Sequence, residues 1–576
     1  MKAARKFPQV PQEARAFTWR LAWVVILLAG GAGAVLYRAV DLQYLNQEFL
    51  ADRGDARVMR VQKILAHRGS IVDRFGELLA VSTPVDAVLV NPRELLEDYE
   101  NIRLLAGALH REPEWLKRRL AGGADRQGLP LNILLEPGQS LRLKQLNIPG
   151  VFTERKYRRY YPAGEVTGHV LGFNNLDDHG QEGLELGYDE ALGGEDGAKR
   201  VQRDNLGRNV KDIASIRAAR PGAVLESSID LRIQYLAYRA LKAAVTEHHA
   251  VSGSVVVVDV DTGEILAMVN QPAFNPNDRS QFDVAHYRNR AALDLIEPGS
   301  VVKPFVVAAA FQAGTLSPQT VIDTNPGTLV FGRYTIRDHE NYGRITPVQI
   351  LAKSSNIGII KIALAQRPED IWSVYTGVGF GQGPASGFPG ETAGLLPPLK
   401  DWRPLAVKSL AFGYGLSMTP MQLVSAYATL ASGGIRRPLT FRRVSTSVPG
   451  ERVINEAVAH SVVNILETVV SEDGTARRAA IEGYRVSGKT GTAQINISGG
   501  YDNNGYVATF AGMVPASKPR LAAVVVISAP QGAHHGGDVS APVFAEIMSG
   551  AVRLMGIPPD NLAGIEPGAL LQANAP

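Results

Sequence analysis

The sequence contains no cysteine among its 576 residues, so no disulfide can link any part of the fold. This absence fits an oxidising compartment, where a stray thiol is a liability. The sequence also lacks a strong excess of one charge, because 60 lysines and arginines stand against 56 aspartates and glutamates, a net charge of +4. The basic residues are scattered rather than gathered in a stripe, which argues against a nucleic-acid partner.

Charged residues are also absent from the apolar run 21–37 (LAWVVILLAGGAGAVLY) near the N-terminus. The length of this run is near the lower limit for a helix that crosses about 30 Å of hydrocarbon. Basic residues dominate the preceding segment 1–20, which predicts a cytoplasmic tail, a single transmembrane anchor and export of residues 38–576. The alternative is a cleaved signal peptide, because Ala32-Gly33-Ala34 is a small-x-small cleavage site. The apolar run continues past that site and favours the uncleaved anchor.

The exported part divides into regions of different character, without an internal repeat. Residues 38–60 are expected to form a helical stem, and 61–220 a mixed, elongated pedestal for docking or dimerisation, with no coherent set of acid–base or metal-ligand residues. From 221 to 556, a β-hairpin at 252–270 is followed by helical patterns and then by more strands. This order predicts an α+β domain, an antiparallel sheet with helices on its faces. Residues 557–576 are expected to be a flexible tail.

The stretch GYRVSGKTGTA, 483–493, has two incompatible interpretations. Gly483 to Thr490 formally matches a phosphate-binding P-loop, which requires a strand, a glycine-rich turn and a helix that starts at the lysine. Here the residues before Lys489 favour a strand and those after Thr490 do not favour a helix. An exported domain also meets essentially no ATP. The second interpretation, a strand K-T-G-T from a serine acyl-transfer site, predicts further catalytic parts upstream.

One serine has a lysine three positions later, in Ser300-Val301-Val302-Lys303. Pro304 is tolerable only in the first turn of a helix, so the helix should begin close to Ser300. The Ser300 hydroxyl would then lie at a helix N-terminus, with Lys303 one turn along on the same face. A lysine can act as the base that activates a serine if burial and neighbouring cations lower its pKa. Lys489 is the candidate second cation.

A third element, Lys353-Ser354-Ser355-Asn356, lies between the other two in the chain. The Ser354 hydroxyl can relay protons between the lysines and a leaving amine, and the Asn356 amide can bind a substrate peptide group. On a strand, Thr490 and Thr492 point to one side, where their hydroxyls can hold a substrate carboxylate. Gly491 allows close approach of the strand, whose edge can pair with an extended peptide. The backbone N–H groups of Ser300 and Thr492 are the candidate oxyanion hole.

Together SVVK, SSN and KTGT resemble the motifs of penicillin-binding proteins and serine β-lactamases. The flanks EPGSVVKPF, KSSNIGIIKIAL, FGYGLSMTPMQLVSAYATLASGG and HHGGDVSAPVF, with AHRGSIVDRFGELLA near the N-terminus, resemble class B penicillin-binding proteins of the division type (FtsI-like). The resemblance runs from the anchor to about residue 555. It departs from the family at Gln494-Ile495, where a lysine is often found, and at His534-His535, where a pair of tyrosines is common.

This resemblance implies a periplasmic peptidoglycan D,D-transpeptidase that is anchored in the inner membrane and works at the division septum. Ser300 would attack the penultimate D-Ala of a stem peptide, release the terminal D-Ala and pass the acyl group to an amine of a neighbouring stem. The family is also acylated by β-lactam antibiotics. Its members work with an FtsW-type septal glycan polymerase and other divisome membrane proteins. No cofactor and no metal is expected.

Other functions remain as alternatives. A membrane-anchored β-lactamase needs a carboxylate that activates water, and Glu451 to Asn455 is an imperfect match to such an element that resembles a surface turn and strand. A β-lactam sensor needs a signalling output that a short cytoplasmic segment does not provide. An elongation-type transpeptidase of the same class differs only in its cellular role. A metal site at His534-His535 lacks a sensibly spaced third ligand.

Overall fold

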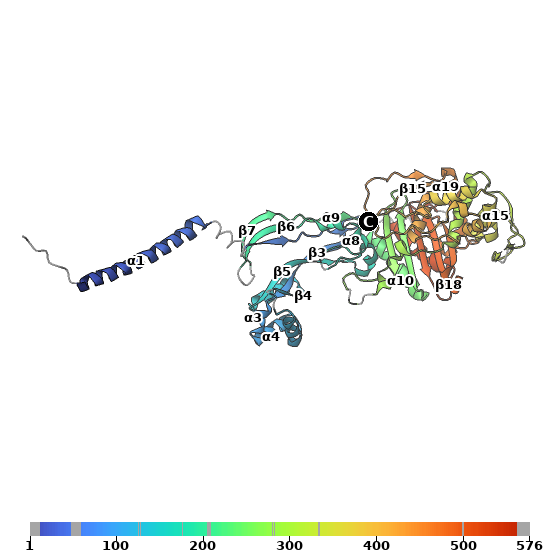
Figure 1. The fold of residues 1–576 in the computed structure, drawn as a ribbon. Coiled ribbons are helices and arrows are strands. Elements are labelled where there is room, and N and C mark those ends of the chain that lie inside the picture. Colours follow the sequence, from blue (N-terminus) through green and yellow to red (C-terminus); the bar gives the residue numbers. More distant parts are fainter. Residues whose placement is uncertain are drawn as a thin grey trace, which may run out of the picture. The chain divides into compact units, whose positions relative to one another are not determined.

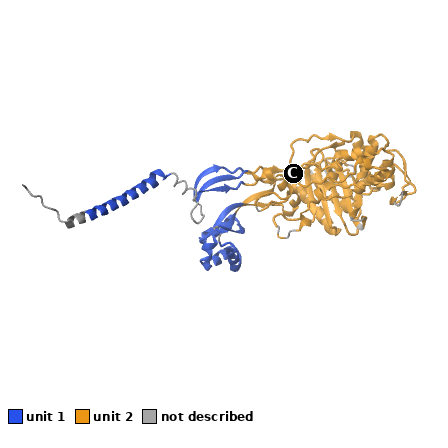
Figure 2. Ribbon diagram, viewed as in Figure 1, with its two compact units in different colours: residues 1–66, 86–156, 195–220 blue, residues 67–85, 157–194, 221–576 orange. Residues whose placement is uncertain are grey.

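The computed structural model describes residues 12–47, 59–124, 126, 128–175, 177–203, 209–278, 280, 283–331, 334–497 and 500–561. The described chain forms two compact units (Figures 1 and 2). The first comprises residues 1–66, 86–156 and 195–220, and the second comprises 67–85, 157–194 and 221–576. Residues 67–85 and 157–194, which were expected in the pedestal, therefore belong to the same compact unit as the C-terminal region.

The N-terminal helix α1 extends over Gln12–Val40, so it is longer than the charge-free run at its centre. The segment Trp19–Leu45 is long and apolar enough to cross a membrane, and none of it is buried within the protein. Apolar side chains that are exposed along a whole helix are those expected of a helix facing lipid. The predicted cytoplasmic tail lies largely outside the described residues, as do residues 48–58 of the predicted stem.

The rest of the first unit contains a three-stranded antiparallel sheet and a small α/β lobe. The sheet has the order β1 (Met59–Ile64), β6 (Gly197–Arg203), β7 (Asn209–Arg217). In the lobe, β3 (Leu78–Val90) pairs with β4 (Leu129–Leu135) and β5 (Val151–Tyr160). Its helices are α3 (Pro92–Leu96), α4 (Tyr99–Ala108), α5 (Pro113–Ala121) and α6 (Pro137–Gln145).

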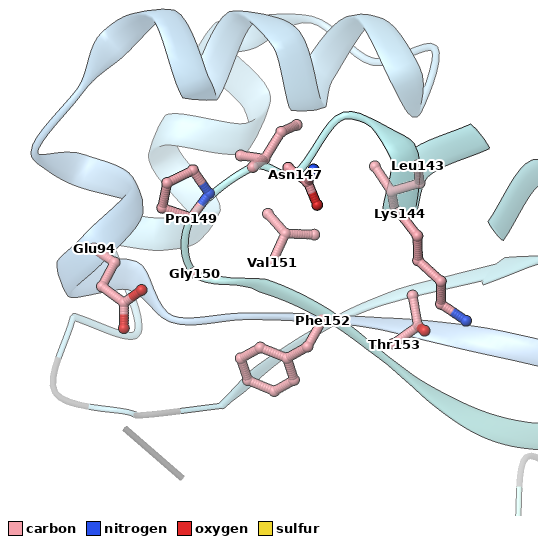
Figure 3. A pocket seen from close by; sticks show the side chains of 10 residues that line it. Glu94, Leu143, Lys144, Asn147, Pro149, Gly150, Val151, Phe152 and Thr153 are labelled. Carbon is pink, nitrogen blue, oxygen red and sulfur yellow. The ribbon is translucent and has the colours of Figure 1, made fainter. Parts of the chain in front are cut away.

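The lobe has its own apolar core, to which α4 and α5 contribute Ile102, Leu105, Leu116 and Leu120. A recess of about 700 Å³ lies on this lobe and is lined by residues from α3, α6 and the start of β5. Figure 3 shows the side chains that line it. The lining contains the charged side chains of Glu94 and Lys144 and no serine.

The second unit is built on a five-stranded antiparallel sheet with the order β10-β9-β19-β18-β17. These strands are β9 (Ser252–Asp259), β10 (Ile265–Gln271), β17 (Ser487–Ile497), β18 (Gly500–Val514) and β19 (Leu521–Ser528). Every residue of β9 is buried, because helices cover both faces of the sheet. The expected hairpin at 252–270 and the expected antiparallel sheet with helical cover are confirmed.

Two long helices pack together over the sheet, α10 (Leu231–Glu247) and α20 (Gly536–Leu554). Asp230 caps α10, because its carboxylate accepts a hydrogen bond from the N–H of Arg232 at 3.0 Å. A second group of helices contains α18 (Pro420–Ala431), which packs on β9, β18 and β19, and α19 (Glu456–Val470), which packs on β17. In the described part of this unit, the remaining α-helices are α7 (Gly168–Leu171), α8 (Gly183–Gly187), α9 (Asp189–Gly193), α11 (Val284–Tyr287), α12 (Arg290–Leu293), α13 (Lys303–Gln312), α14 (Pro347–Lys353), α15 (Asn356–Leu364), α16 (Pro368–Gly377) and α17 (Pro404–Ala411).

Short strands complete the unit: β2 (Ile71–Val72), β8 (Leu225–Glu226), β11 (Ile322–Asp323), β12 (Thr328–Phe331), β13 (Tyr334–Arg337), β14 (Arg344–Ile345), β15 (Ile435–Arg436) and β16 (Glu451–Arg452). Strand β8 has only two residues, and the last helix, α20, begins at Gly536 and holds Pro542 in its interior.

The chain stays packed beyond the expected start of the tail at 557. Ile557 is buried, and the Asp560 carboxylate accepts hydrogen bonds from the N–H groups of Arg485 and Ser517 at 2.7 and 3.1 Å. A carboxylate that satisfies two backbone donors holds this segment against the unit. The rest of the predicted tail, residues 562–576, lies outside the described residues.

Candidate active site

Ser300 lies in the 3-10 helix η3 (Gly299–Val302), which continues directly into α13. Pro304 occupies the first turn of α13, where its missing N–H is not needed. Gly299 has a φ of +58°, a conformation that favours glycine. The Ser300 side chain is half-buried and lines a cleft of about 590 Å³. The helix therefore begins close to Ser300, as the sequence predicted, and the candidate nucleophile lies at its start.

Lys303 is fully buried next to the loop that joins α14 to α15. Its Nζ donates to the backbone carbonyl of Ser354 at 2.7 Å and to Oδ1 of Asn356 at 2.8 Å. Burial lowers the pKa of Lys303 to about 7, although the nearby Asp338 carboxylate acts in the opposite direction. An amine with this pKa is present as free base and as ammonium near neutrality, as a general base requires.

Lys489 reaches the same loop from strand β17. Its Nζ lies 2.9 Å from the Ser354 hydroxyl and 3.1 Å from the carbonyl of Thr490. Burial, with the positive charge of Lys303, holds the pKa of Lys489 well below its usual value. The Ser354 hydroxyl is also 3.3 Å from Nζ of Lys303. One hydroxyl therefore lies between two buried amines, a geometry suited to passing a proton from one to the other.

The Ser354 position depends on unusual backbone geometry. Ser354 ends α14 with a φ of +59°, and Ser355 then caps α15 by accepting the N–H of Gly358 at 2.9 Å. The break between the two helices turns the Ser354 carbonyl and hydroxyl toward Lys303. A non-glycine residue in the left-handed region carries backbone strain, which is common at functional positions.

Strand β17 forms one end of the five-stranded sheet and carries Thr490 and Thr492 into the cleft. The Thr490 hydroxyl is 2.9 Å from that of Thr475. The Thr492 hydroxyl accepts the N–H of Gly536, the first residue of α20, at 3.1 Å. The Thr492 hydroxyl therefore stands beside the positive end of a long helix, which favours an anionic group.

Gly491 lies between these threonines, and its missing side chain matters for packing. A Cβ on Gly491 would lie 2.8 Å from the carbonyl oxygen of Pro298 and 3.0 Å from Cγ1 of Val301. Contacts this short require the backbone to shift. Glycine at this position lets β17 approach η3, and so brings the Thr490 and Thr492 pair beside Ser300.

The cleft thus collects the side chains that three distant motifs supply. Ser300, Ser354, Asn356, Thr490 and Thr492 line it together. Lys303 and Lys489 lie behind this surface, fully buried, and are joined to it through the Ser354 hydroxyl.

Sequence reasoning missed Asp338, which follows β13. Its carboxylate accepts the Ser355 hydroxyl at 2.6 Å and the N–H groups of Asn356 and Ile357 at 2.5 and 3.1 Å. It thereby fixes the N-terminus of α15 and the backbone of Asn356. No local motif marks Asp338, because its partners lie on another segment of the chain.

The geometry contradicts the P-loop interpretation and the candidate water-activating residue of a β-lactamase. Lys489 and Thr490 lie inside strand β17, so no helix starts at the lysine as a P-loop requires. Glu451, the candidate water-activating carboxylate of a β-lactamase, is exposed on β16 and is not part of the cleft lining.

Comparison with known proteins identifies both regions of the chain. Residues 253–549 match the penicillin binding protein transpeptidase domain, and residues 63–227 match the penicillin-binding protein dimerisation domain. The chain is 41% identical over 572 residues to peptidoglycan D,D-transpeptidase FtsI of Escherichia coli K12, covering 98% of this chain and 97% of that protein. It is 39% identical over 545 residues to the probable peptidoglycan D,D-transpeptidase PbpC of Pseudomonas aeruginosa, covering 94% and 96%.

Solved structures give the same result. A peptidoglycan synthetase from Bifidobacterium adolescentis is 25% identical, with a TM-score of 0.69 over 87% of this chain and 98% of that chain. The apo transpeptidase domain of penicillin-binding protein 3 from Burkholderia pseudomallei is 42% identical, with a TM-score of 0.54 over 58% of this chain and 97% of that chain. With three motifs converging on one cleft and relatives matching over nearly the whole length, the chain belongs to the class B penicillin-binding proteins, the peptidoglycan D,D-transpeptidases.

Proposed function

We propose that this chain crosslinks peptidoglycan stem peptides through a Ser300 acyl-enzyme. The Ser300 Oγ attacks the carbonyl carbon of the penultimate D-Ala and gives up its proton to the free amine of Lys303. The tetrahedral intermediate collapses with cleavage of the peptide bond, and the departing amine of the terminal D-Ala takes up a proton through Ser354. An amine of a second stem peptide then attacks the ester, which forms the crosslink and returns the hydroxyl to Ser300.

One observation carries this proposal: two buried lysines share the Ser354 hydroxyl in the cleft that Ser300 lines. Neither lysine is neutralised by a salt bridge within the described part of the chain. Burial therefore lowers the pKa of each, and at neutral pH the pair can hold one proton fewer than two ordinary lysines would. Such a pair can accept the serine proton and return it later in the same reaction cycle.

The remaining residues are assigned to substrate binding. The Thr490 and Thr492 hydroxyls hold the terminal carboxylate of the donor peptide beside the N-terminus of α20. The Asn356 amide contacts the donor backbone. The open edge of β17 pairs with the extended peptide, and the N–H groups of Ser300 and Thr492 receive the oxyanion. Loss of one such donor costs about 3 kcal/mol or more of transition-state stabilisation.

The acyl-enzyme is the species that tests this function. Full-length protein in detergent, mixed with benzylpenicillin, should gain the mass of one intact penicillin on a peptide that contains Ser300, and Ser300→Ala should gain none. The matched control Ser317→Ala changes an exposed serine of the same unit and should retain the adduct. Labelling of another peptide would refute the assignment. Rapid loss of the adduct would favour the β-lactamase alternative.

We further propose that the chain works at the division septum, with its N-terminus in the cytoplasm and its catalytic unit in the periplasm, beside an FtsW-type polymerase and other divisome proteins. The similarity to FtsI and the positive charge before α1 support this assignment. Depletion of the protein in its host should then produce filaments. Round cells would instead indicate the elongation-type role.

A further inference from the structure

Three histidines line the cleft together with Ser300: His339 follows β13, and His534 and His535 precede α20. Their rings form a connected row, with centroids 4.5 Å apart for His534 and His535 and 6.1 Å apart for His339 and His535. We call this row the histidine wall. The acyl-transfer steps described above use none of the three.

The position of the wall within the cleft is well defined. The ring of His534 stacks on Tyr506 of β18 at 4.2 Å, and its Nδ1 lies 3.3 Å from the carbonyl of Gly532. His535 directly precedes Gly536, whose N–H donates to the Thr492 hydroxyl. The wall therefore adjoins the hydroxyl that is proposed to hold the substrate carboxylate, while His339 and His535 stay exposed to solvent.

Histidine is the residue whose charge changes near neutral pH, with an ordinary pKa of about 6.5. In the wall, partial burial and the two neighbouring imidazoles lower the pKa of His535, and Asp538 in the first turn of α20 opposes them. His535 is therefore uncharged at mildly alkaline pH and gains positive charge as the medium becomes acidic.

The charged groups around the histidine wall leave its positive charge available for binding an anion. Asp338, next to His339, is committed to the N-terminus of α15, and Glu340 is exposed on its other side. Lys303 and Lys489 lie behind the Ser354 hydroxyl and add positive potential. Asp538 is thus the one carboxylate that lines the described cleft.

We propose that the histidine wall is a pH-dependent anion site that recognises a second carboxylate on the acyl donor, beyond the one assigned to Thr490 and Thr492. The inference rests on the proposed function, because the donor must enter this cleft to be bound there. A donor with an additional carboxylate reacts faster as the wall becomes protonated, while a donor without it does not gain.

Two penicillins provide a matched pair of acyl donors. Benzylpenicillin and its α-carboxy derivative carbenicillin share the ring system and differ by one side-chain carboxylate, which stays ionised in this pH range. The acylation rate of full-length protein in detergent is measured for both between pH 8 and pH 5.5. Because both donors use the same Ser300 and the same lysines, titration of the catalytic base cancels in the ratio of the two rates.

The carbenicillin-to-benzylpenicillin ratio should rise about three- to tenfold on acidification, as expected for one partly exposed charge pair. The rise should disappear in the double variant His339→Gln, His535→Gln and persist in His460→Gln, which changes an exposed histidine of α19. The single variant His339→Gln, at an exposed position, should reduce the rise and serves if the double variant does not fold.

A flat ratio in the unmodified protein overturns the inference, and so does a rise that the wall variants leave intact. Absence of any adduct with either penicillin, at every pH, would instead contradict the proposed function. The two failures are therefore distinguishable in one set of measurements.

Discussion

At the scale of single residues, the buried lysine pair has the largest consequences. Lys303 and Lys489 are fully buried, and such burial disfavours the ammonium form. The free energy that burial costs appears as lowered pKa values, and these suit proton transfer at neutral pH. A residue that decreases the stability of the fold is here useful for the reaction.

The pH dependence of acylation follows from Lys303. Its pKa of about 7 means that the reactive free base is lost as pH falls, so the acylation rate at low benzylpenicillin should drop about tenfold per pH unit below pH 7. Above pH 8 the rate should level off. A rate that stays constant between pH 5.5 and 8 would contradict the role of a lysine base.

Removal of the amine tests the same residue. Lys303→Met keeps the length of the side chain and removes the proton acceptor, so acylation should fall by at least about 100-fold. The variant should keep a cooperative thermal unfolding transition, because no buried charge has to be accommodated. Lys400→Met, at an exposed lysine of the same unit, should react like the unmodified protein.

At the scale of elements, the short break between α14 and α15 positions Ser354 and Asn356 in the cleft, and Asp338 stabilises this break. The Asp338 carboxylate accepts three hydrogen bonds at the start of α15. Hydrogen bonds to a charged group contribute about 1.5–3 kcal/mol each. The helix end, the Asn356 amide and the Ser354 carbonyl are therefore placed by one side chain from outside the helix.

Asp338→Asn should lower the acylation rate about tenfold and decrease the thermal stability of the unit. Because the carboxylate raises the pKa of Lys303, its removal should also move the midpoint of the acylation pH profile below 7. Glu340→Gln, at an exposed neighbour, provides the control. A slower reaction with an unchanged midpoint would mean that Asp338 acts on the structure alone.

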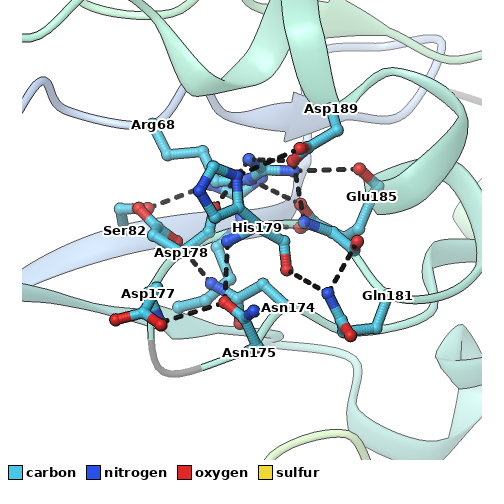
Figure 4. Close-up of polar contacts among 12 residues, drawn as sticks. Arg68, Ser82, Asn174, Asn175, Asp177, Asp178, His179, Gln181, Glu185 and Asp189 are labelled. Atoms are coloured by element: carbon cyan, nitrogen blue, oxygen red, sulfur yellow. Dashed lines mark hydrogen bonds and ion pairs between the residues drawn. The ribbon is translucent and has the colours of Figure 1, made fainter.

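At the scale of the whole molecule, the catalytic unit depends on segments far upstream of its motifs. Arg68 is buried and donates to the Glu185 carboxylate at 2.7 Å, to its backbone carbonyl at 2.9 Å and to Asp189 at 2.6 Å. Arg159 also donates to Glu185, at 2.6 Å. Figure 4 shows the interactions around Arg68. This network joins residues 67–85 to 157–194 within the second unit.

Glu185→Ala leaves two buried arginines without their shared partner, so the unit should lose about 3–5 kcal/mol of stability. Arg239→Ala breaks an exposed pair with Glu546 and should cost no more than about 1 kcal/mol. Denaturant unfolding of the full chain, followed by loss of penicillin labelling, compares the two. Equal effects would show that the network does not support this unit.

The sequence by itself determined the fold class, the candidate membrane span, the family and the candidate catalytic residues. These properties depend on local patterns: an uncharged apolar run, alternating strands, Pro304 in a first turn and three short motifs in a fixed order. Local patterns also predicted that a helix starts at Ser300 and that Gly491 allows its strand to approach closely, because backbone geometry restricts both positions.

Only the tertiary structure decided which residues of distant segments lie next to one another. The shared Ser354 hydroxyl, the carboxylate of Asp338 on the end of α15 and the approach of His339 to His535 all join segments that are distant in the chain. The same is true of the unit boundary, since residues 67–85 and 157–194 pack with the catalytic region. Burial and the pKa of a lysine depend on every segment that folds over it, and no local pattern records that.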